Sequence, residues 1–195
     1  MKSKKQLVVF ARAPRLGYGK TRLAKDIGPE AAYNFYRSCL SATLQECSNA
    51  PWQLVVAVAS EEDSTHPLFE THNVITQING GLGQRMINEL SNNQAHHTII
   101  IGSDIPELRK QHVQTAFETL DHHDLVFGPA SDGGFWLVGC RQQFEFPQSF
   151  MQNVRWSTPH ALGDTLRTIS KSAKVAQVAT LSDVDDATSF NSLPN

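Results

Sequence analysis

The sequence of 195 residues has no hydrophobic run that approaches the roughly 20 residues of a membrane-spanning helix. A signal peptide is not expected either, because the apolar run at residues 7–11 is too short and ends at Arg12. The three cysteines, Cys39, Cys47 and Cys140, have neither the spacing of a metal-binding pair nor that of a disulfide framework. We therefore expect a reduced, cytoplasmic protein that has no membrane partner.

Acidic residues are absent from the first 25 positions, which contain eight lysines and arginines. The other 170 residues contain nine basic and 19 acidic side chains, and the net charge of the whole chain is −2. This asymmetry indicates a local site for an anion, although Lys2, Lys4 and Lys5 have the alternative of forming a plain solvated terminus. No nucleic-acid partner is expected, because the acidic remainder would repel a polyanion.

Apolar residues make up 40% of the sequence and charged residues 18%, as in ordinary globular proteins. Short apolar runs alternate with segments of helical periodicity, which predicts an α/β fold with a mostly parallel sheet in one domain, residues 1–195. Strands are expected at residues 6–11, 54–59, 74–78, 98–102, 125–128, 135–139 and 175–181. Helices are expected at residues 29–47, 82–90, 112–120 and 158–170.

Ligands of such sheets bind beyond the carboxyl ends of the strands, so the loops that follow strands are the first candidates for a site. The loop of residues 11–23 contains four basic side chains and two glycines, namely Arg12, Arg15, Lys20, Arg22, Gly17 and Gly19. It has three interpretations: a P-loop, a basic turn without function, or a nucleotide-phosphate loop of another fold. A P-loop requires glycine at position 14, where Pro14 has no N–H for a phosphate, so the third interpretation is favoured.

Asp104 comes after the strand expected at residues 98–102, between a glycine and a proline turn. A carboxylate at this place can coordinate a hard cation, and the alternative is that it caps the next turn. The acidic stretch at residues 182–186 is either a solvated run, a helix cap, or the source of a second metal ligand, Asp183 or Asp185. Mg²⁺ typically binds through one or two carboxylates together with substrate phosphates and water.

Asp132, Gly133 and Gly134 lie between two expected strands. An Asp-Gly pair alone signals a hairpin, but the preceding Gly-Pro and the following aromatic pair favour a close approach of the backbone to a substrate. The histidine pairs at residues 96–97 and 122–123 precede strands and are expected at the surface, because adjacent residues of an extended chain point in opposite directions.

Six segments together resemble a known family. They are ARAPRLGYGKTRLA (residues 11–24), QINGGLGQRM (77–86), GSDIPEL (102–108), GPASDGGFWLVG (128–139), RWSTP (155–159) and LSDVDD (181–186). They resemble the bacterial radical-SAM/selenodomain-associated transferase 1 family, over residues 6–190. That family is similar to GT-A-fold nucleotide-diphospho-sugar transferases, including 2-phospholactate and molybdenum-cofactor guanylyltransferases. The resemblance implies a GT-A-like, Rossmann-type three-layer sandwich.

The resemblance also implies roles for single residues. The nucleotide loop would include Arg12, Pro14, Gly17, Lys20 and Arg22, and Gly83 and Arg85 would lie near the base or phosphates. Asp104 would be the principal metal ligand and Asp185 the second. The acceptor side would be formed by Asp132, Gly133, Gly134, Trp156, Ser157 and Thr158. The chain departs from the family at Ser189, where an acid is common, which weakens a role for the tail beyond Asp183 and Asp185.

Two reactions fit this resemblance, and both use Mg²⁺ or Mn²⁺ on the phosphates of a nucleotide together with a small-molecule acceptor. In nucleotidyl transfer a nucleoside triphosphate loses pyrophosphate, and in glycosyl transfer a nucleotide sugar loses a nucleoside diphosphate. GT-A glycosyltransferases usually hold the metal with an Asp-x-Asp, whereas here one acid, Asp104, is followed by Ile-Pro, which slightly favours nucleotidyl transfer. Asp104, Lys20 and Asp132 are the expected catalytic residues. A nucleotide-binding protein without catalytic activity is the third hypothesis.

Overall fold

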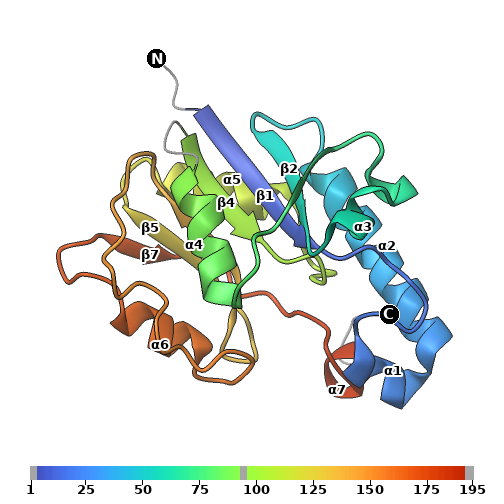
Figure 1. The fold of residues 1–195 in the computed structure, drawn as a ribbon. Helices are drawn as coiled ribbons and strands as arrows, with labels where there is room; N and C mark the ends of the chain where they lie inside the picture. Colours follow the sequence, from blue (N-terminus) through green and yellow to red (C-terminus); the bar gives the residue numbers. More distant parts are fainter. Residues whose placement is uncertain (1–3, 93–95, 192–195) are drawn as a thin grey trace.

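The computed structural model describes residues 4–92 and 96–191, and the side chains of Lys4 and His96 are outside this description, as is all of Lys2. In the described part of the chain, seven strands form one sheet in the order β3-β2-β1-β4-β6-β5-β7 (Figure 1). β6 is antiparallel to both of its neighbours, and all the other neighbouring pairs are parallel. The predicted α/β fold with a mostly parallel sheet is therefore confirmed. The strands are β1 (Lys4–Ala11), β2 (Gln53–Val58), β3 (Asn73–Thr76), β4 (His96–Ile101), β5 (Leu125–Pro129), β6 (Phe135–Cys140) and β7 (Val175–Gln177).

The central strand β1 is buried on both faces, as its continuous apolar sequence predicts. Leu7 and Val9 belong to the core on one face, and Val8 belongs to the core on the other. Val8 is paired in register with Val55 of β2 and with Ile100 of β4. Each strand end is therefore fixed relative to its neighbours, which fixes the loops that follow.

Helices cover both faces of the sheet and form the outer layers. The first core contains side chains of α2 (Pro29–Cys47) and α5 (Lys110–Thr119), and the second contains side chains of α4 (Leu82–Asn92) and α6 (Ala161–Arg167). Figure 1 shows α4 in front of the sheet and α5 behind it. α2 begins with Pro29 at its first turn, where the missing N–H costs nothing, and its buried residues recur at helical spacing. The remaining helical elements are α1 (Thr21–Ile27), α3 (Glu61–Ser64), η1 (Pro67–Phe69) and α7 (Ala187–Asn191).

Two expected elements are shorter in the structure than in the prediction. The helix expected at residues 158–170 begins only at Ala161, because Ser157 has a left-handed backbone (φ 58°) and the hydroxyl of Thr158 accepts from the backbone N–H of His160. The strand expected at residues 175–181 ends at Gln177. Leu181 then returns to the sheet through an isolated bridge to Ala130.

One histidine differs from the expectation that both histidine pairs lie at the surface. His97 belongs to β4 and is buried, and its Nδ1 accepts from the backbone N–H of Gln142 at 3.1 Å. Burial lowers the pKa of His97, although Asp121 lies 3.5 Å from Nε2. The expectation was wrong because the return segment after β6 covers this end of β4.

The three cysteines are buried and free, and burial raises the pKa of each thiol to about 12. No helix in the part of the chain that the structure describes is long and apolar enough to cross a membrane.

Candidate functional site

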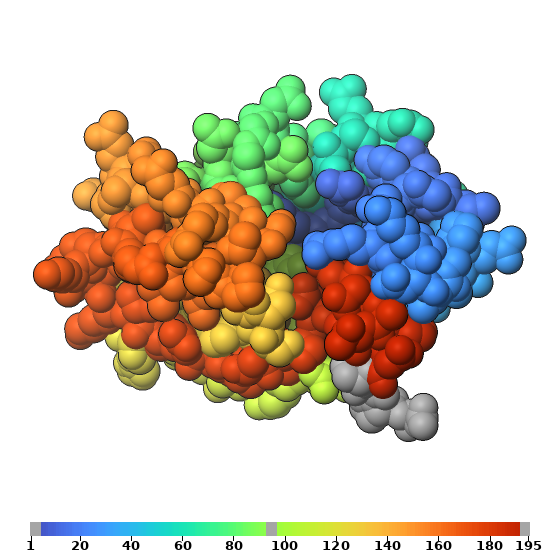
Figure 2. All heavy atoms as spheres, turned by 90° about the horizontal axis from the view of Figure 1, so that it is seen from below, coloured from blue at the N-terminus to red at the C-terminus, as the bar shows by residue number. Residues whose placement is uncertain are grey.

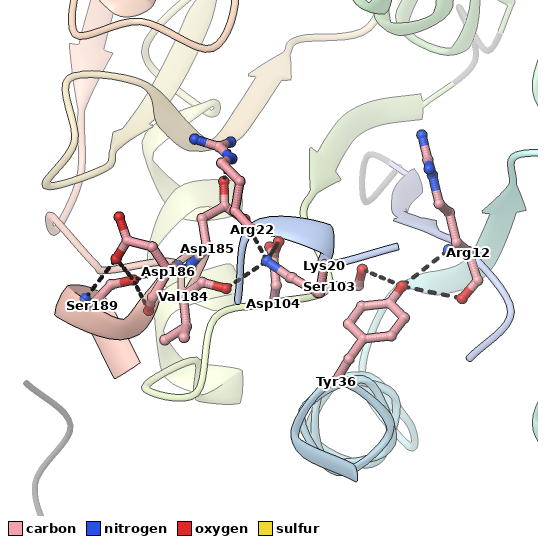
Figure 3. A network of polar contacts seen from close by, with 10 residues as sticks. All are labelled: Arg12, Lys20, Arg22, Tyr36, Ser103, Asp104, Val184, Asp185, Asp186 and Ser189. Carbon is pink, nitrogen blue, oxygen red and sulfur yellow. Dashed lines mark hydrogen bonds and ion pairs between the residues drawn. The ribbon is translucent and has the colours of Figure 1, made fainter. Parts of the chain in front are cut away.

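Three loops that are far apart in the sequence meet beyond the carboxyl ends of β1 and β4. They are the loop after β1, the loop after β4 that contains Asp104, and the acidic segment at residues 182–186 (Figure 3). The backbone N–H of Val184 donates to the carbonyl of Asp104 at 3.2 Å, and Val184 itself is fully buried against α1 and α2. The acidic segment is thereby held next to the β4 loop.

Three carboxylates converge at this meeting point. One oxygen from each of Asp104, Asp183 and Asp185 lies within 4.8 Å of the others, and all three side chains are half-buried. Such a set of hard oxygen donors, without a histidine or cysteine, suits Mg²⁺ or Mn²⁺. Burial, together with the charges of Asp104, Asp132 and Asp185, raises the pKa of Asp183 to about 6. A divalent cation would offset the cost of burying this carboxylate and would relieve its repulsion by the neighbouring carboxylates.

The ammonium group of Lys20 lies between two of these carboxylates. It donates to Asp104 Oδ2 at 2.6 Å, to Asp185 Oδ1 at 2.5 Å and to the carbonyl of Val184 at 2.6 Å. The side chain is 9% exposed. Burial alone would lower the pKa of Lys20, but its attraction to the two carboxylates outweighs burial and raises the pKa.

The backbone of Lys20 is unusual as well. Its φ of 44° lies in the left-handed region, which a residue with a Cβ adopts only when the surrounding structure enforces it. Lys20 occupies the N-cap of α1 without a side-chain cap, because an ammonium group cannot accept a hydrogen bond from the backbone N–H groups there. The loop thus stores some strain to place this cation.

A basic cavity of about 450 Å³ opens beside the carboxylates. Its basic lining residues are Arg12, Lys20, Arg22 and Arg85. Figure 2 shows the hollow on this face, between the blue N-terminal loop, the green start of α4 and the red C-terminal segment. Several cations around one cleft at the end of a parallel sheet suit the charge of a phosphorylated ligand.

Tyr36 of α2 also lines this cavity, although it was not among the predicted site residues. Its hydroxyl donates to the carbonyl of Arg12, accepts from the backbone N–H of Arg12, both at 3.1 Å, and lies 3.2 Å from the hydroxyl of Ser103. It therefore ties the loop after β1 to the loop after β4 (Figure 3). The helical spacing of α2 predicted its burial but not the role of its hydroxyl.

An aromatic cavity of about 250 Å³ adjoins the basic cavity, and the two share Phe10, Arg22, Leu82, Gly102 and Asp185 in their walls. The aromatic cavity is lined by Phe10, Phe135, Trp136 and Trp156, together with Asp132, Asp183 and Ser157. Phe135 and Trp156 meet edge to face with ring centroids 6.1 Å apart. Asp132 is fixed by the backbone N–H of Gly134, which donates to its Oδ1 at 2.8 Å.

Some residues with predicted roles have other contacts in the structure. A Cβ at Gly133 would lie 2.3 Å from the carbonyl oxygen of Pro159, so this glycine allows a close approach to the protein's own backbone. A Cβ at Gly83 would lie 2.9 Å from Trp156, so Gly83 allows α4 to pack against that ring. The hydroxyl of Thr158 donates to the carbonyl of Arg155, within its own loop.

Two residues of the loop after β1 also lie away from the two cavities. Pro14 is buried, and it and Gly17 line two other hollows, both next to Tyr33. The loop is anchored by Arg15, which pairs with Glu62 at 2.6 Å and with Asp63 at 3.4 Å. Arg12, Lys20 and Arg22 are the predicted loop residues that the structure brings to the cavities.

The raised pKa of Asp183 predicts an effect on stability. A carboxyl whose pKa is raised on folding contributes stability below its unfolded value near 3.9, and this contribution is lost as the pH rises through about 6. In EDTA at pH 7.5, Asp183→Asn should therefore stabilise the fold by about 1–2 kcal/mol after allowance for solvent screening, or raise Tm by roughly 2–8 °C. Thermal unfolding at pH 7.5 and pH 4 measures this.

Glu70→Gln, at an exposed position, is the matched control for removal of one negative charge and should leave Tm nearly unchanged. At pH 4 the gain from Asp183→Asn should disappear, because the native carboxyl is then protonated. An equal gain at both pH values would contradict the proposed repulsion.

Comparison with solved structures places this arrangement in a known fold. The structure described as a "putative nucleotide-diphospho-sugar transferase" from Desulfovibrio desulfuricans G20 has a TM-score of 0.86 and 27% identity, over 97% of this chain and 85% of that one. CMP:2-keto-3-deoxy-manno-octonic acid synthetase complexed with CTP has a TM-score of 0.58 and 15% identity, over 97% and 96% of the two chains.

Glucosyl-3-phosphoglycerate synthase from Mycobacterium tuberculosis, in complex with Mn²⁺, UDP and glucosyl-3-phosphoglycerate, has a TM-score of 0.58 and 11% identity, over 93% of this chain and 71% of that one. At these identities the second and third structures show the fold alone, and the GT-A-like fold expected from the sequence is confirmed. No curated protein matches the sequence. Residues 41–158 match the family described as "Uncharacterized protein conserved in bacteria (DUF2064)", and the chain belongs to this family.

Proposed function

We propose that this protein is a Mg²⁺- or Mn²⁺-dependent transferase that uses a nucleotide, and that it transfers a nucleotidyl group. The observation that carries the proposal is the position of Asp104, Asp183 and Asp185 at the edge of a cavity lined by four basic side chains. A metal bound there would neutralise and orient the phosphates of the nucleotide. Asp104 and Asp185 would hold the metal, with Asp183 as a further ligand.

The chain's own cations would bind the remaining phosphate charge. Arg12, Arg22 and Arg85 line the basic cavity, and their charge-assisted hydrogen bonds would fix the nucleotide in one orientation. Lys20 would move from the carboxylates to the phosphates when the metal binds. Catalysis of phosphoryl chemistry depends mainly on such positioning and charge stabilisation. The resemblance to radical-SAM-associated transferases supports the proposal that the protein is a transferase. The buried thiols support the proposal that the enzyme is cytoplasmic.

Glycosyl transfer from a nucleotide sugar is the second candidate. It is favoured by the similarity, over 97% of this chain, to the Desulfovibrio protein described as a nucleotide-diphospho-sugar transferase. Nucleotidyl transfer is favoured by the sequence Asp104-Ile-Pro, which provides one acid where GT-A glycosyltransferases usually have an Asp-x-Asp. A P-loop enzyme is disfavoured because the Lys20 ammonium binds carboxylates and position 14 is proline.

A thermal-shift scan tests the proposal and separates the two reactions. A nucleotide at 100 times its Kd stabilises the fold by about 2.7 kcal/mol, which raises Tm by roughly 5–11 °C for a domain of this size. A nucleotidyltransferase should give the larger shift with a nucleoside triphosphate and Mg²⁺. A glycosyltransferase should give it with a nucleotide sugar and Mn²⁺.

EDTA is the control in this scan and should remove most of either shift, because the metal joins the phosphates to Asp104 and Asp185. If only the nucleotide sugar stabilises, glycosyl transfer replaces nucleotidyl transfer. If no nucleotide stabilises the protein with either metal, the proposal of a nucleotide-dependent transferase is wrong.

A further inference from the structure

The acidic segment that carries two of the three carboxylates has little regular structure of its own. Residues 182–186 form neither helix nor strand. Within the segment, the backbone N–H of Val184 donates to the carbonyl of Asp104 at 3.2 Å. After Asp186 the chain runs directly into α7, a helix of five residues. The position of Asp185 therefore depends on contacts on both sides of it along the chain.

A reciprocal pair of hydrogen bonds joins the acidic segment to α7. Asp186 precedes the helix, and its Oδ1 accepts from the backbone N–H of Ser189 at 2.9 Å. The hydroxyl oxygen of Ser189 accepts in turn from the backbone N–H of Asp186 at 3.2 Å and from that of Asp185 at 3.1 Å (Figure 3). Such a capping box usually has glutamate or glutamine at the place of Ser189, so serine makes here the bond that an acid usually makes. One side chain of α7 thus holds the backbone of a candidate metal ligand.

α7 packs on α1 and α2, in a third core that is separate from the two cores on the faces of the sheet. The ring of Phe190 meets that of Phe35 of α2 edge to face, with centroids 5.3 Å apart. Asp26 of α1 accepts from the backbone N–H of Ala187 at 3.2 Å. The buried members of this third core are Leu23, Ala32 and Val184. Because α1 begins directly after Lys20, the ammonium and the carboxylates of the site are attached to the same small core.

α7 is too short to be stable without these contacts. Isolated helices of fewer than roughly 12–15 residues are marginal in water, so α7 stays helical only while it is docked. When a site is complete in only a fraction of the molecules, the apparent Kd of its ligand rises in inverse proportion to that fraction. By the same linkage, a metal ion bound to Asp185 stabilises the docked helix.

We infer that residues 186–190 are a positioning part of the metal site, and that Ser189 and Phe190 hold Asp185 where it can reach the metal. This inference rests on the proposed function, because it takes Asp185 as a metal ligand. It assigns a role to the tail beyond Asp185, contrary to the expectation from the departure at Ser189. Binding of the metal and docking of α7 are then coupled.

Removal of one hydroxyl tests the cap. Ser189→Ala should weaken the binding of Mn²⁺ by roughly two- to thirtyfold, which is the effect that loss of a helix cap has on an equilibrium. Ser189→Thr keeps the hydroxyl and should bind Mn²⁺ as the wild type does. Ser170→Ala is the matched control, because the Ser170 hydroxyl also accepts from a backbone N–H but lies before β7, outside both cavities. Electron paramagnetic resonance of Mn²⁺ measures these affinities.

Substitution of the ring separates positioning from general stability. Phe190→Ala should lower Tm and also weaken Mn²⁺ binding by at least about tenfold, because the burial of the ring and its contact with Phe35 are lost. Phe190→Leu should restore most of both. Phe146 is also half-buried and stacks on Phe150 at 4.7 Å, outside both cavities. Phe146→Ala should lower Tm as well, but it should leave the affinity for Mn²⁺ unchanged.

Hydrogen exchange of the wild-type protein measures the coupling itself. Saturating Mn²⁺ should slow the exchange of the backbone amides at residues 185–190 by at least about threefold, as detected by mass spectrometry. Unchanged exchange there would overturn the inference. So would wild-type affinity for Mn²⁺ in both Ser189→Ala and Phe190→Ala, or an equal loss of affinity in Phe146→Ala. If the wild-type protein binds no Mn²⁺, the proposed function itself fails and the inference fails with it, so the two failures are distinguished.

Discussion

Asp104→Asn should reduce transfer by at least about 100-fold while the protein remains folded. Asp104 is the carboxylate that joins the β4 loop to both Asp183 and Asp185, and asparagine removes its charge while it keeps its shape. Loss of one preorganised charge-stabilising group typically costs roughly 3 kcal/mol of transition-state stabilisation. Release of pyrophosphate from a nucleoside triphosphate, or of nucleoside diphosphate from a nucleotide sugar, measures the loss.

Glu107→Gln is the matched control for this substitution. Glu107 lies on the same loop, is exposed, and accepts from the backbone N–H of Ser182 at 3.4 Å, which glutamine can still do. It should retain nearly full activity. Wild-type turnover and an unchanged Mg²⁺ dependence in the Asp104 variant would show that Asp104 is not a metal ligand. Failure of the variant to fold would show that Asp104 is a structural cap.

Lys20→Met should change the affinities for metal and for nucleotide in opposite directions. The ammonium lies 2.6 Å from an oxygen of Asp104 and 2.5 Å from an oxygen of Asp185, so a cation entering from solvent has to displace it. Two unit charges 4 Å apart interact by about 1–4 kcal/mol near a protein surface, so Mn²⁺ alone should bind the variant at least about tenfold more tightly. A nucleotide with Mg²⁺ should bind roughly ten- to a hundredfold more weakly, because a charge-assisted bond to phosphate is lost.

Electron paramagnetic resonance of Mn²⁺ and calorimetry with nucleotide measure the two affinities. Lys25→Met is the control, since Lys25 is an exposed lysine of α1 that lines neither cavity. An unchanged affinity for Mn²⁺ in Lys20→Met would mean that the ammonium does not occupy the place of the metal. Equal loss of nucleotide affinity in both variants would mean that the basic residues attract the nucleotide through their combined charge, and that Lys20 makes no specific contact with it.

The order of elements was predictable because their periodicities are local. The short, continuous apolar runs of β1, β2 and β4 are typical of strands buried on both faces, and the helical spacing in α2 indicates which side it buries. The reversed direction of β6 was not predictable, because strand pairing is a long-range property. The late start of α6 depends on the left-handed backbone of Ser157, which helix propensity does not reveal.

The candidate site was predictable only as a set of loops. Asp104 could be selected because it follows a strand, and parallel strands place their ends at one edge of the sheet. The acidic stretch offered either Asp183 or Asp185, and only the resemblance singled out Asp185. The ion pairs of Lys20 link positions 84 and 165 residues away, and no local pattern encodes such a contact. The resemblance assigned ligand contacts to the glycines at positions 83 and 133, and the sequence alone could not show that Trp156 and Pro159 also pack against them.

The central claim is that the three carboxylates bind the metal that carries the nucleotide phosphates. Crystals soaked with Mn²⁺ and a nucleoside triphosphate, measured at a wavelength where manganese scatters anomalously, test it most directly. The expected result is an anomalous peak coordinated by Asp104 and Asp185, with nucleotide phosphates on its other side and Lys20 turned from the carboxylates toward them. A nucleotide bound elsewhere, or no manganese among Asp104, Asp183 and Asp185 while nucleotide fills the basic cavity, would contradict the claim.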